Sequence, residues 1–222
     1  MKILVTGKNG QLGQSIKRLL DEKCFANLSS FSFIFTGREE LNLENLESIQ
    51  SYFVRNDIDI IINCAAYTKV DQAEEDQNQA NLINHNAVRE LAKISKKNKI
   101  KLIHISTDFI FDGEDGPYKE DDEPNPLSYY GLSKLKSEHL LQAHAVKWTI
   151  LRTIIVFGVG ENLSKGNIVL WAKGALEKGE PLNIIDDQFR APTLAEDLAD
   201  ACILAANKKA YGIFNASGKD IM

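Results

Sequence analysis

The chain opens with the feature that most constrains its fold, an apolar run followed at once by three regularly spaced glycines. Residues 1–6 have the length and composition of a buried strand, and Gly7, Gly10 and Gly13 follow it in the pattern Gly-x-x-Gly-x-x-Gly. From Leu12 onward, leucine and isoleucine recur at helical spacing. A strand, a glycine-rich turn and a helix in this order are typical of a dinucleotide-binding unit, although three glycines also fit an ordinary strand-to-helix turn.

Each glycine has its own physical use in such a turn. Gly7 permits the tight turn, Gly10 lets the backbone approach a pyrophosphate, and Gly13 lets the helix pack close to the strand. The free amides and the positive end of the helix dipole attract phosphate. We therefore predict that a dinucleotide contacts Gly7, Asn9, Gly10, Gln11, Leu12 and Gly13.

The loop after the second expected strand bears on which dinucleotide binds. Residues 31–36 are predicted to form that strand, and Arg38 follows it. Many dinucleotide sites have an acidic residue here for the ribose hydroxyls, whereas a guanidinium suits a 2′-phosphate. The sequence thus favours NADPH, with NADH as the alternative if Arg38 is a solvated residue paired with Glu39 or Glu40.

Apolar strands alternate with amphipathic helices along most of the chain. This alternation predicts an α/β fold with a Rossmann-like, doubly wound parallel sheet. Ligands on such sheets bind at the carboxyl ends of the strands, where residues 7–13, 65–67 and 106–108 should gather. The expected strands are residues 59–63, 101–106, 149–158 and 212–217, and the expected helices are residues 87–94, 129–144 and 194–206.

Two loops interrupt this alternation and suggest a division into parts. Residues 111–126 are acidic and rich in turn formers, and residues 158–167 contain glycines that suggest a flap. We expect a dinucleotide-binding domain over residues 1–158 and a substrate-binding segment over residues 159–193. Residues 194–217 should return to the first domain, and residues 218–222 should begin a further substrate-binding region.

Tyr130 and Lys134 are candidates for proton chemistry. Residues four apart on a helix share one face, so the phenol and the ammonium would point into the same space. A neighbouring cation should lower the pKa of Tyr130 and make it a proton donor or acceptor near neutral pH. Thr107, at the end of a strand, could hold the reacting oxygen. The alternative is that Tyr130 and Lys134 are two exposed helix residues.

Composition excludes several classes of protein. The hydrophobic fraction of 44% and the charged fraction of 26% are ordinary for a globular protein, and the net charge of −5 argues against a nucleic-acid surface. Three cysteines without Cys-x-x-Cys spacing fit neither a disulfide framework nor a zinc site, so no metal is expected. Since no leader or membrane-spanning run is visible, we expect a cytoplasmic protein without membrane partners. His85 and His104 are expected to be structural.

Taken together, these residues resemble the extended short-chain dehydrogenase/reductase family, and within it the dTDP-4-dehydrorhamnose reductase branch. The resemblance covers essentially the whole chain, and the part most specific to the branch is residues 105–134. The stretches that carry it are residues 6–13 (TGKNGQLG), 63–71 (NCAAYTKVD), 105–113 (ISTDFIFDG), 117–127 (PYKEDDEPNPL), 130–134 (YGLSK), 152–153 (RT) and 187–193 (DQFRAPT).

The resemblance implies a reaction and a set of site residues. The reaction would be hydride transfer from NADPH to the 4-keto carbon of a nucleotide-linked 6-deoxyhexose, with Thr107, Tyr130 and Lys134 as the catalytic triad. Tyr130 would donate the proton, Lys134 would hold the nicotinamide ribose, and a homodimer is a further expectation. Besides the glycine loop and Arg38, the cofactor would contact Cys64, Ala65, Ala66, Tyr67, Ser106, Tyr130 and Lys134, and the substrate would contact Thr107, Asp108, Phe109 and Arg190.

The sequence departs from the family pattern in two places. The family's glycine between Asp-Gln and Pro-Thr is replaced, because Phe189, Arg190 and Ala191 stand there, which bears on the identity of the sugar. Family members also run some tens of residues further. We therefore expect a truncated piece with a small, incomplete C-terminal substrate-binding portion.

Three rival functions share the fold. Relatives that dehydrate sugar nucleotides resemble one another in having Asp-Glu after the strand threonine, but here Asp108 is followed by Phe109, which has no proton chemistry. A 4-epimerase fits residues 105–127 less well than a reductase does. A non-catalytic nucleotide-binding regulatory subunit would have no need of Thr107, Tyr130 and Lys134 together.

Overall fold

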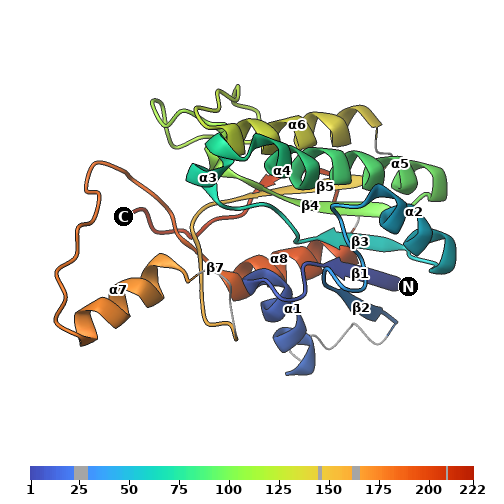
Figure 1. Ribbon diagram of the computed structural model, residues 1–222, viewed down its shortest axis with the longest axis horizontal. Coiled ribbons are helices and arrows are strands. Elements are labelled where there is room, and N and C mark those ends of the chain that lie inside the picture. Colours follow the sequence, from blue (N-terminus) through green and yellow to red (C-terminus); the bar gives the residue numbers. More distant parts are fainter. Residues whose placement is uncertain (23–29, 145–146, 162–165, 209) are drawn as a thin grey trace.

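The computed structural model describes residues 1–22, 30–144, 147–161, 166–208 and 210–222. Cys24 and residues 162–165 of the loop expected at 158–167 lie outside the described residues. A six-stranded parallel sheet lies between two layers of helices (Figure 1). In the order β2-β1-β3-β4-β5-β8, its strands are β2 (Ser32–Thr36), β1 (Lys2–Thr6), β3 (Ile60–Asn63), β4 (Lys101–Thr107), β5 (Trp148–Thr153) and β8 (Gly212–Asn215).

Side chains alternate between the two faces of each strand and so build two apolar cores. Leu4, Ile61 and Leu102 pack on one face with helices α2 (Leu46–Arg55), α5 (Val88–Asn98) and α6 (Tyr129–His144). Ile3, Ile62 and Ile103 pack on the other face with α1 (Gln11–Asp21) and α8 (Ala195–Asn207). Both faces of the sheet are buried, so the strands read as nearly continuous apolar runs, as a parallel sheet requires. The predicted doubly wound fold is confirmed.

One expected strand is wrong. The sequence predicts a strand over residues 149–158, but β5 ends at Thr153 and Ile155 has a positive φ of 34°. The chain turns there and forms β6 (Val156–Phe157), which pairs with β7 (Thr193–Leu194) in a separate small sheet. The Thr193 amide donates to the carbonyls of Ile154 and Ile155, which ties this turn to the start of α8.

Several short elements have no counterpart in the expectations from sequence. They are α3 (Val70–Glu75), α4 (Gln77–Asn81), the π-helical turn η1 (Leu82–Ala87), the 3-10 turn η2 (Asp108–Ile110) and α7 (Ile168–Glu177), together with α2 above. Residues 111–126 form the expected loop. No helix of the described residues is long and apolar enough to cross a membrane.

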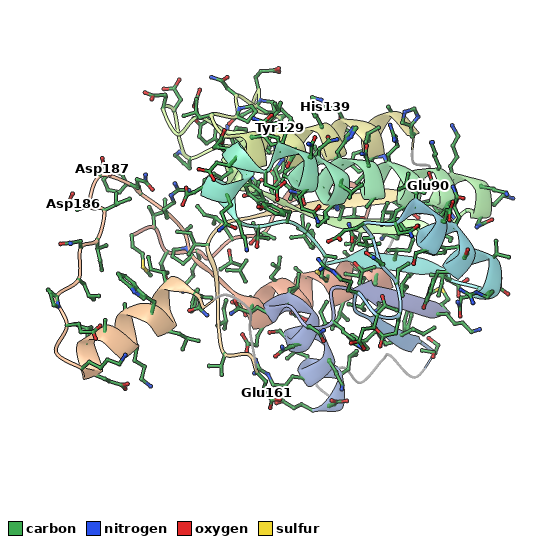
Figure 2. All side chains as sticks on the ribbon, in the orientation of Figure 1. Glu90, Tyr129, His139, Glu161, Asp186 and Asp187 are labelled. Carbon is green, nitrogen blue, oxygen red and sulfur yellow. The ribbon has the colours of Figure 1, made fainter. Side chains whose placement is uncertain are left out.

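The predicted substrate-binding parts of the chain lie together at one end of the molecule. Helix α7 and the extended segment after it project away from the sheet, and Asp186 and Asp187 lie on that segment (Figures 1 and 2). Arg190 and Met222 exchange two backbone hydrogen bonds, from each amide to the other carbonyl, at 2.8 and 2.9 Å. This contact places residues 218–222 beside the end of the 159–193 segment, although the domain boundaries themselves stay a prediction.

Candidate active site

The carboxyl ends of the sheet strands border one cavity of about 890 Å³. Most of the residues predicted to bind cofactor or substrate line it, whereas Tyr67 and Arg190 are not among the lining residues. The lining includes Gly7, Asn9, Gly10, Gln11, Leu12, Gly13, Arg38, Cys64, Ala65, Ala66, Ser106, Thr107, Asp108, Phe109, Tyr130 and Lys134.

The glycine loop leaves room for a phosphate because side chains cannot occupy it. Gly7 has a φ of +71°, and a Cβ added there would lie 2.9 Å from the Ala65 amide nitrogen. A Cβ on Gly13 would lie 2.4 Å from the Gly7 carbonyl oxygen. Helix α1 begins after Gly10 without a side-chain cap, and residues 10–13 line the cavity, so no capping side chain occupies the first amides of the helix. The buried Gln11 Nε2 also has no partner within the described chain. A dinucleotide pyrophosphate fits this cradle.

Two cations lie near Gly37, and one of them, Arg38, lines the cavity. Arg38 is 72% exposed and pairs with Glu44 at 2.5 Å, while Lys8 pairs with Glu40. The interpretation of Arg38 as a partner of Glu39 or Glu40 is therefore wrong. Because the Arg38 side chain is mostly solvent-exposed, its ion pair with Glu44 is weak and an incoming phosphate can displace the carboxylate at small cost.

The candidate catalytic residues meet at the cavity floor. Thr107 ends β4, and Tyr130 and Lys134 lie in the first turns of α6 with 8% and 2% of their surface exposed. The alternative of two exposed helix residues is therefore wrong. Gly131 allows this approach, since a Cβ there would lie 2.1 Å from the Phe109 carbonyl oxygen. The ring of Phe109 meets the Tyr130 ring edge-on, with centroids 5.7 Å apart.

Burial shifts the pKa of Tyr130 in the direction opposite to the one expected from the sequence. The pKa of Tyr130 is raised to about 12, chiefly by desolvation and also by the charge of Asp108, while the hydrogen bond with Thr107 opposes the rise. Desolvation lowers the pKa of Lys134 to about 8, and the charge of Glu138 opposes this shift. The prediction that Lys134 makes the pKa of Tyr130 low is therefore wrong. Tyr130 holds its proton at neutral pH and can only donate it.

Beside the catalytic candidates, Arg190 forms an ion pair with Asp108, and of these two only Asp108 lines the cavity. Thr107 Oγ1 donates to Asp108 Oδ1 at 3.1 Å, and the Arg190 guanidinium lies 5.4 Å from the centre of the Phe109 ring. Burial raises the pKa of Asp108, and the charge of Arg190 opposes this rise. Arg190 thus reaches the catalytic cluster through Asp108 and Phe109 without lining the cavity itself.

Sequence reasoning identified only part of the polar support around this cluster. Asn84 is buried and bonds the Tyr67 amide and carbonyl and the Ser133 hydroxyl. Asn63 and Ser137 are buried beside His104, and neither was predicted. The available signal for Asn63 was a polar residue at the end of an otherwise apolar strand. Within the described chain, no group of three or more His, Cys, Asp or Glu residues could hold a metal ion.

The family model of the RmlD substrate binding domain matches residues 1–222. The chain belongs to this family. The dTDP-4-dehydrorhamnose reductase of Aggregatibacter actinomycetemcomitans is 34% identical over 98% of the chain and 74% of the relative. The resemblance to the extended short-chain dehydrogenase/reductase family and to this branch is confirmed.

Solved structures of the RmlD family agree with this assignment. The dTDP-4-dehydrorhamnose reductase of Clostridium acetobutylicum superimposes with a TM-score of 0.90 at 34% identity, covering 100% of the chain and 75% of that protein. The Bacillus anthracis reductase, solved in complex with NADP, gives a TM-score of 0.89 at 30% identity, covering 99% of the chain and 75% of that protein.

Proposed function

We propose that this chain reduces the 4-keto group of a nucleotide-linked 6-deoxyhexose with NADPH, the dTDP-4-dehydrorhamnose reductase reaction. The observation that carries the proposal is the buried cluster of Thr107, Tyr130 and Lys134 at the floor of a dinucleotide-sized cavity. The RmlD relatives support the same reaction by their names, and the Bacillus anthracis structure supports NADP. NADH is the alternative cofactor.

The residues of the chain divide the chemistry between binding and proton transfer. NADPH would supply a hydride to the carbonyl carbon. The Thr107 hydroxyl would hydrogen-bond the keto oxygen, and the neutral Tyr130 phenol would give that oxygen its proton. Lys134 would hold the cofactor ribose and stabilise the phenolate left on Tyr130. Asp108, Phe109 and Arg190 would contact the sugar.

The packing of Phe109 argues against the dehydratase alternative. Its ring lies against Tyr130, at the position where a dehydratase would need a proton-transferring carboxylate. A non-catalytic subunit would still bind NADPH, so binding alone does not separate it from a reductase. A cytoplasmic location, with Cys64 and Cys202 as free thiols, and a homodimer belong to the same proposal.

The reaction is tested by following absorbance of the reduced nicotinamide after mixing NADPH with dTDP-4-dehydrorhamnose. We expect oxidation of NADPH that depends on the sugar nucleotide and yields dTDP-rhamnose. If NADPH were oxidised only with another keto sugar, that sugar would replace dTDP-4-dehydrorhamnose as the proposed substrate. Tight NADPH binding without oxidation by any keto sugar would contradict the enzymatic proposal and favour the regulatory subunit.

Replacing Arg38 with alanine is expected to raise the Kd for NADPH about tenfold and to leave the Kd for NADH within about twofold. The guanidinium is itself largely exposed, so the loss of its ion pair with the half-buried Glu44 should change stability little. Fluorescence titration with each cofactor measures both constants, and Arg55→Ala, at the end of α2, is the control. Equal losses for the two cofactors would show that Arg38 does not contact a 2′-phosphate.

A further inference from the structure

A row of buried polar side chains crosses the sheet beneath the candidate site. Thr6, Asn63 and His104 occupy paired positions on β1, β3 and β4, so their side chains lie next to one another on one face. None of the three has more than 2% of its surface exposed. The next row on the same face is wholly apolar, so packing alone does not account for three polar residues here. That row consists of Leu4, Ile61 and Leu102.

The hydrogen bonds along this row run in one direction. The Ala65 amide donates to Thr6 Oγ1 at 3.3 Å, and the Thr6 hydroxyl donates to Asn63 Oδ1 at 2.7 Å. Asn63 therefore presents its amide nitrogen to His104 Nδ1, 3.2 Å away. Because an amide nitrogen only donates, His104 Nδ1 accepts, and the neutral ring carries its proton on Nε2.

The other ring nitrogen faces the candidate catalytic lysine. Ser137 Oγ lies 3.1 Å from His104 Nε2 and already donates to the Lys134 carbonyl at 2.6 Å, so it accepts from the ring. Lys134 Nζ lies 3.2 Å from the same Nε2 and donates to the Ile105 carbonyl at 2.5 Å. A protonated Nε2 cannot accept from the ammonium.

The charged groups around the ring favour the same arrangement. Burial holds the pKa of His104 well below its ordinary value, and the positive charge of Lys134 adds to this effect. The ring therefore stays neutral when the lysine is charged. The remaining N–H groups of Lys134 must turn away from His104, toward the cavity that Lys134 lines.

We propose that His104 is a positioning residue for Lys134. The Thr6 and Asn63 side chains fix its Nε2–H tautomer, and its ring edge directs the lysine N–H groups into the dinucleotide cavity. This inference rests on the proposed function only in taking Lys134 as a cofactor-binding residue. It also connects the strand before the glycine loop with the helix that carries Tyr130.

The tautomer is tested on the unmodified protein by nitrogen NMR of isotopically labelled histidine. We expect His104 to show an unprotonated Nδ1 and a protonated Nε2 throughout the neutral range. An Nδ1–H tautomer, or a doubly protonated ring at neutral pH, would overturn the proposal. This measurement needs neither a variant nor a substrate.

The positioning role is tested by two variants, each of which keeps a hydrogen-bonding group in the place of one of the two ring nitrogens. In His104→Gln the amide nitrogen reaches the place of Nε2, whereas in His104→Asn it reaches only the place of Nδ1. We expect the Kd for NADPH to stay within about twofold in the first variant and to rise about tenfold in the second. The control is His139→Gln, on the exposed side of α6 (Figure 2).

Both dissociation constants are measured by fluorescence titration. The protein concentration is corrected for the folded fraction, which an unfolding curve of each variant gives. Equal NADPH affinities in the two His104 variants would overturn the proposal and leave the row a purely structural one. If His104→Asn does not fold, the NMR tautomer decides. Since NADPH binding requires no sugar, failure of this inference is distinguishable from failure of the proposed reduction.

Discussion

Tyr130→Phe is expected to lower kcat for sugar reduction by about 10²–10⁴-fold, the usual contribution of a positioned proton donor. The phenol is buried, and its pKa of about 12 keeps it protonated at neutral pH. Removing the hydroxyl therefore removes the proton donor, while the ring can still pack against Phe109. The Kd for NADPH should change by less than about threefold, because the lost group acts on the substrate oxygen.

The neighbouring Tyr129 supplies a matched control. It begins the same helix (Figure 2) but is only half-buried, and it does not line the cavity; the centre of its ring lies 5.8 Å from Lys136 Nζ. Tyr129→Phe should keep kcat within about twofold, as an ordinary surface substitution does. If Tyr130→Phe retained most of the wild-type kcat at equal NADPH affinity, another group would have to supply the proton.

The elements closest to the candidate site could be predicted because local patterns determine them. The glycine turn needs residues without side chains, and helix α6 occupies residues 129–144, the range that its sequence predicts. The break after β5 could not be predicted, since Ile155 adopts a positive φ that isoleucine normally avoids. The turn is held by contacts with a distant part of the chain, namely the pairing of β6 with β7 and the hydrogen bonds from the Thr193 amide.

The pKa shifts of the site residues were harder to predict than which residues form the site. Spacing alone placed Tyr130 beside Lys134 and suggested a lowered tyrosine pKa. The sign depends instead on how deeply each group is buried, because desolvation is the largest cause of both shifts. The bonding of His104 likewise depends on the register of three strands, which no local pattern contains.

Lys134→Met is expected to abolish useful turnover and yet to stabilise the protein at neutral pH. The ammonium is almost fully buried, and burial lowers its pKa from 10.5 to about 8. That shift corresponds to a folding penalty on the order of 3 kcal/mol below pH 8. Methionine fills a similar volume without a charge, although the Ile105 carbonyl loses the one bond that Lys134 donates to it. We therefore expect a net gain of about 1–2 kcal/mol in the free energy of unfolding, smaller than the penalty removed, with kcat down about 10²-fold or more.

The lowered pKa of Lys134 also determines how the stability of the protein changes with pH. Between the folded pKa of about 8 and the unfolded value near 10.5, the unfolded chain binds more protons than the folded chain. The stability of the wild type should therefore rise with pH across this window, and the advantage of Lys134→Met should shrink and vanish near its upper end. Denaturant unfolding at a series of pH values measures both proteins. NADPH binding by the wild type should weaken over the same window as Lys134 loses its charge.

Lys101→Met separates the effect of the site from the effect of burying any lysine. Burial also lowers the pKa of Lys101 to about 8, but its Nζ donates to the carbonyls of Ala205 and Lys208 at the end of α8. Its loss should leave NADPH affinity unchanged and should not stabilise the fold, because two carbonyls lose their donor. A stabilised, fully active Lys134→Met would show that the buried ammonium serves neither the cofactor nor Tyr130. A stabilised but inactive variant would show that the protein keeps a destabilising charge because the site requires it.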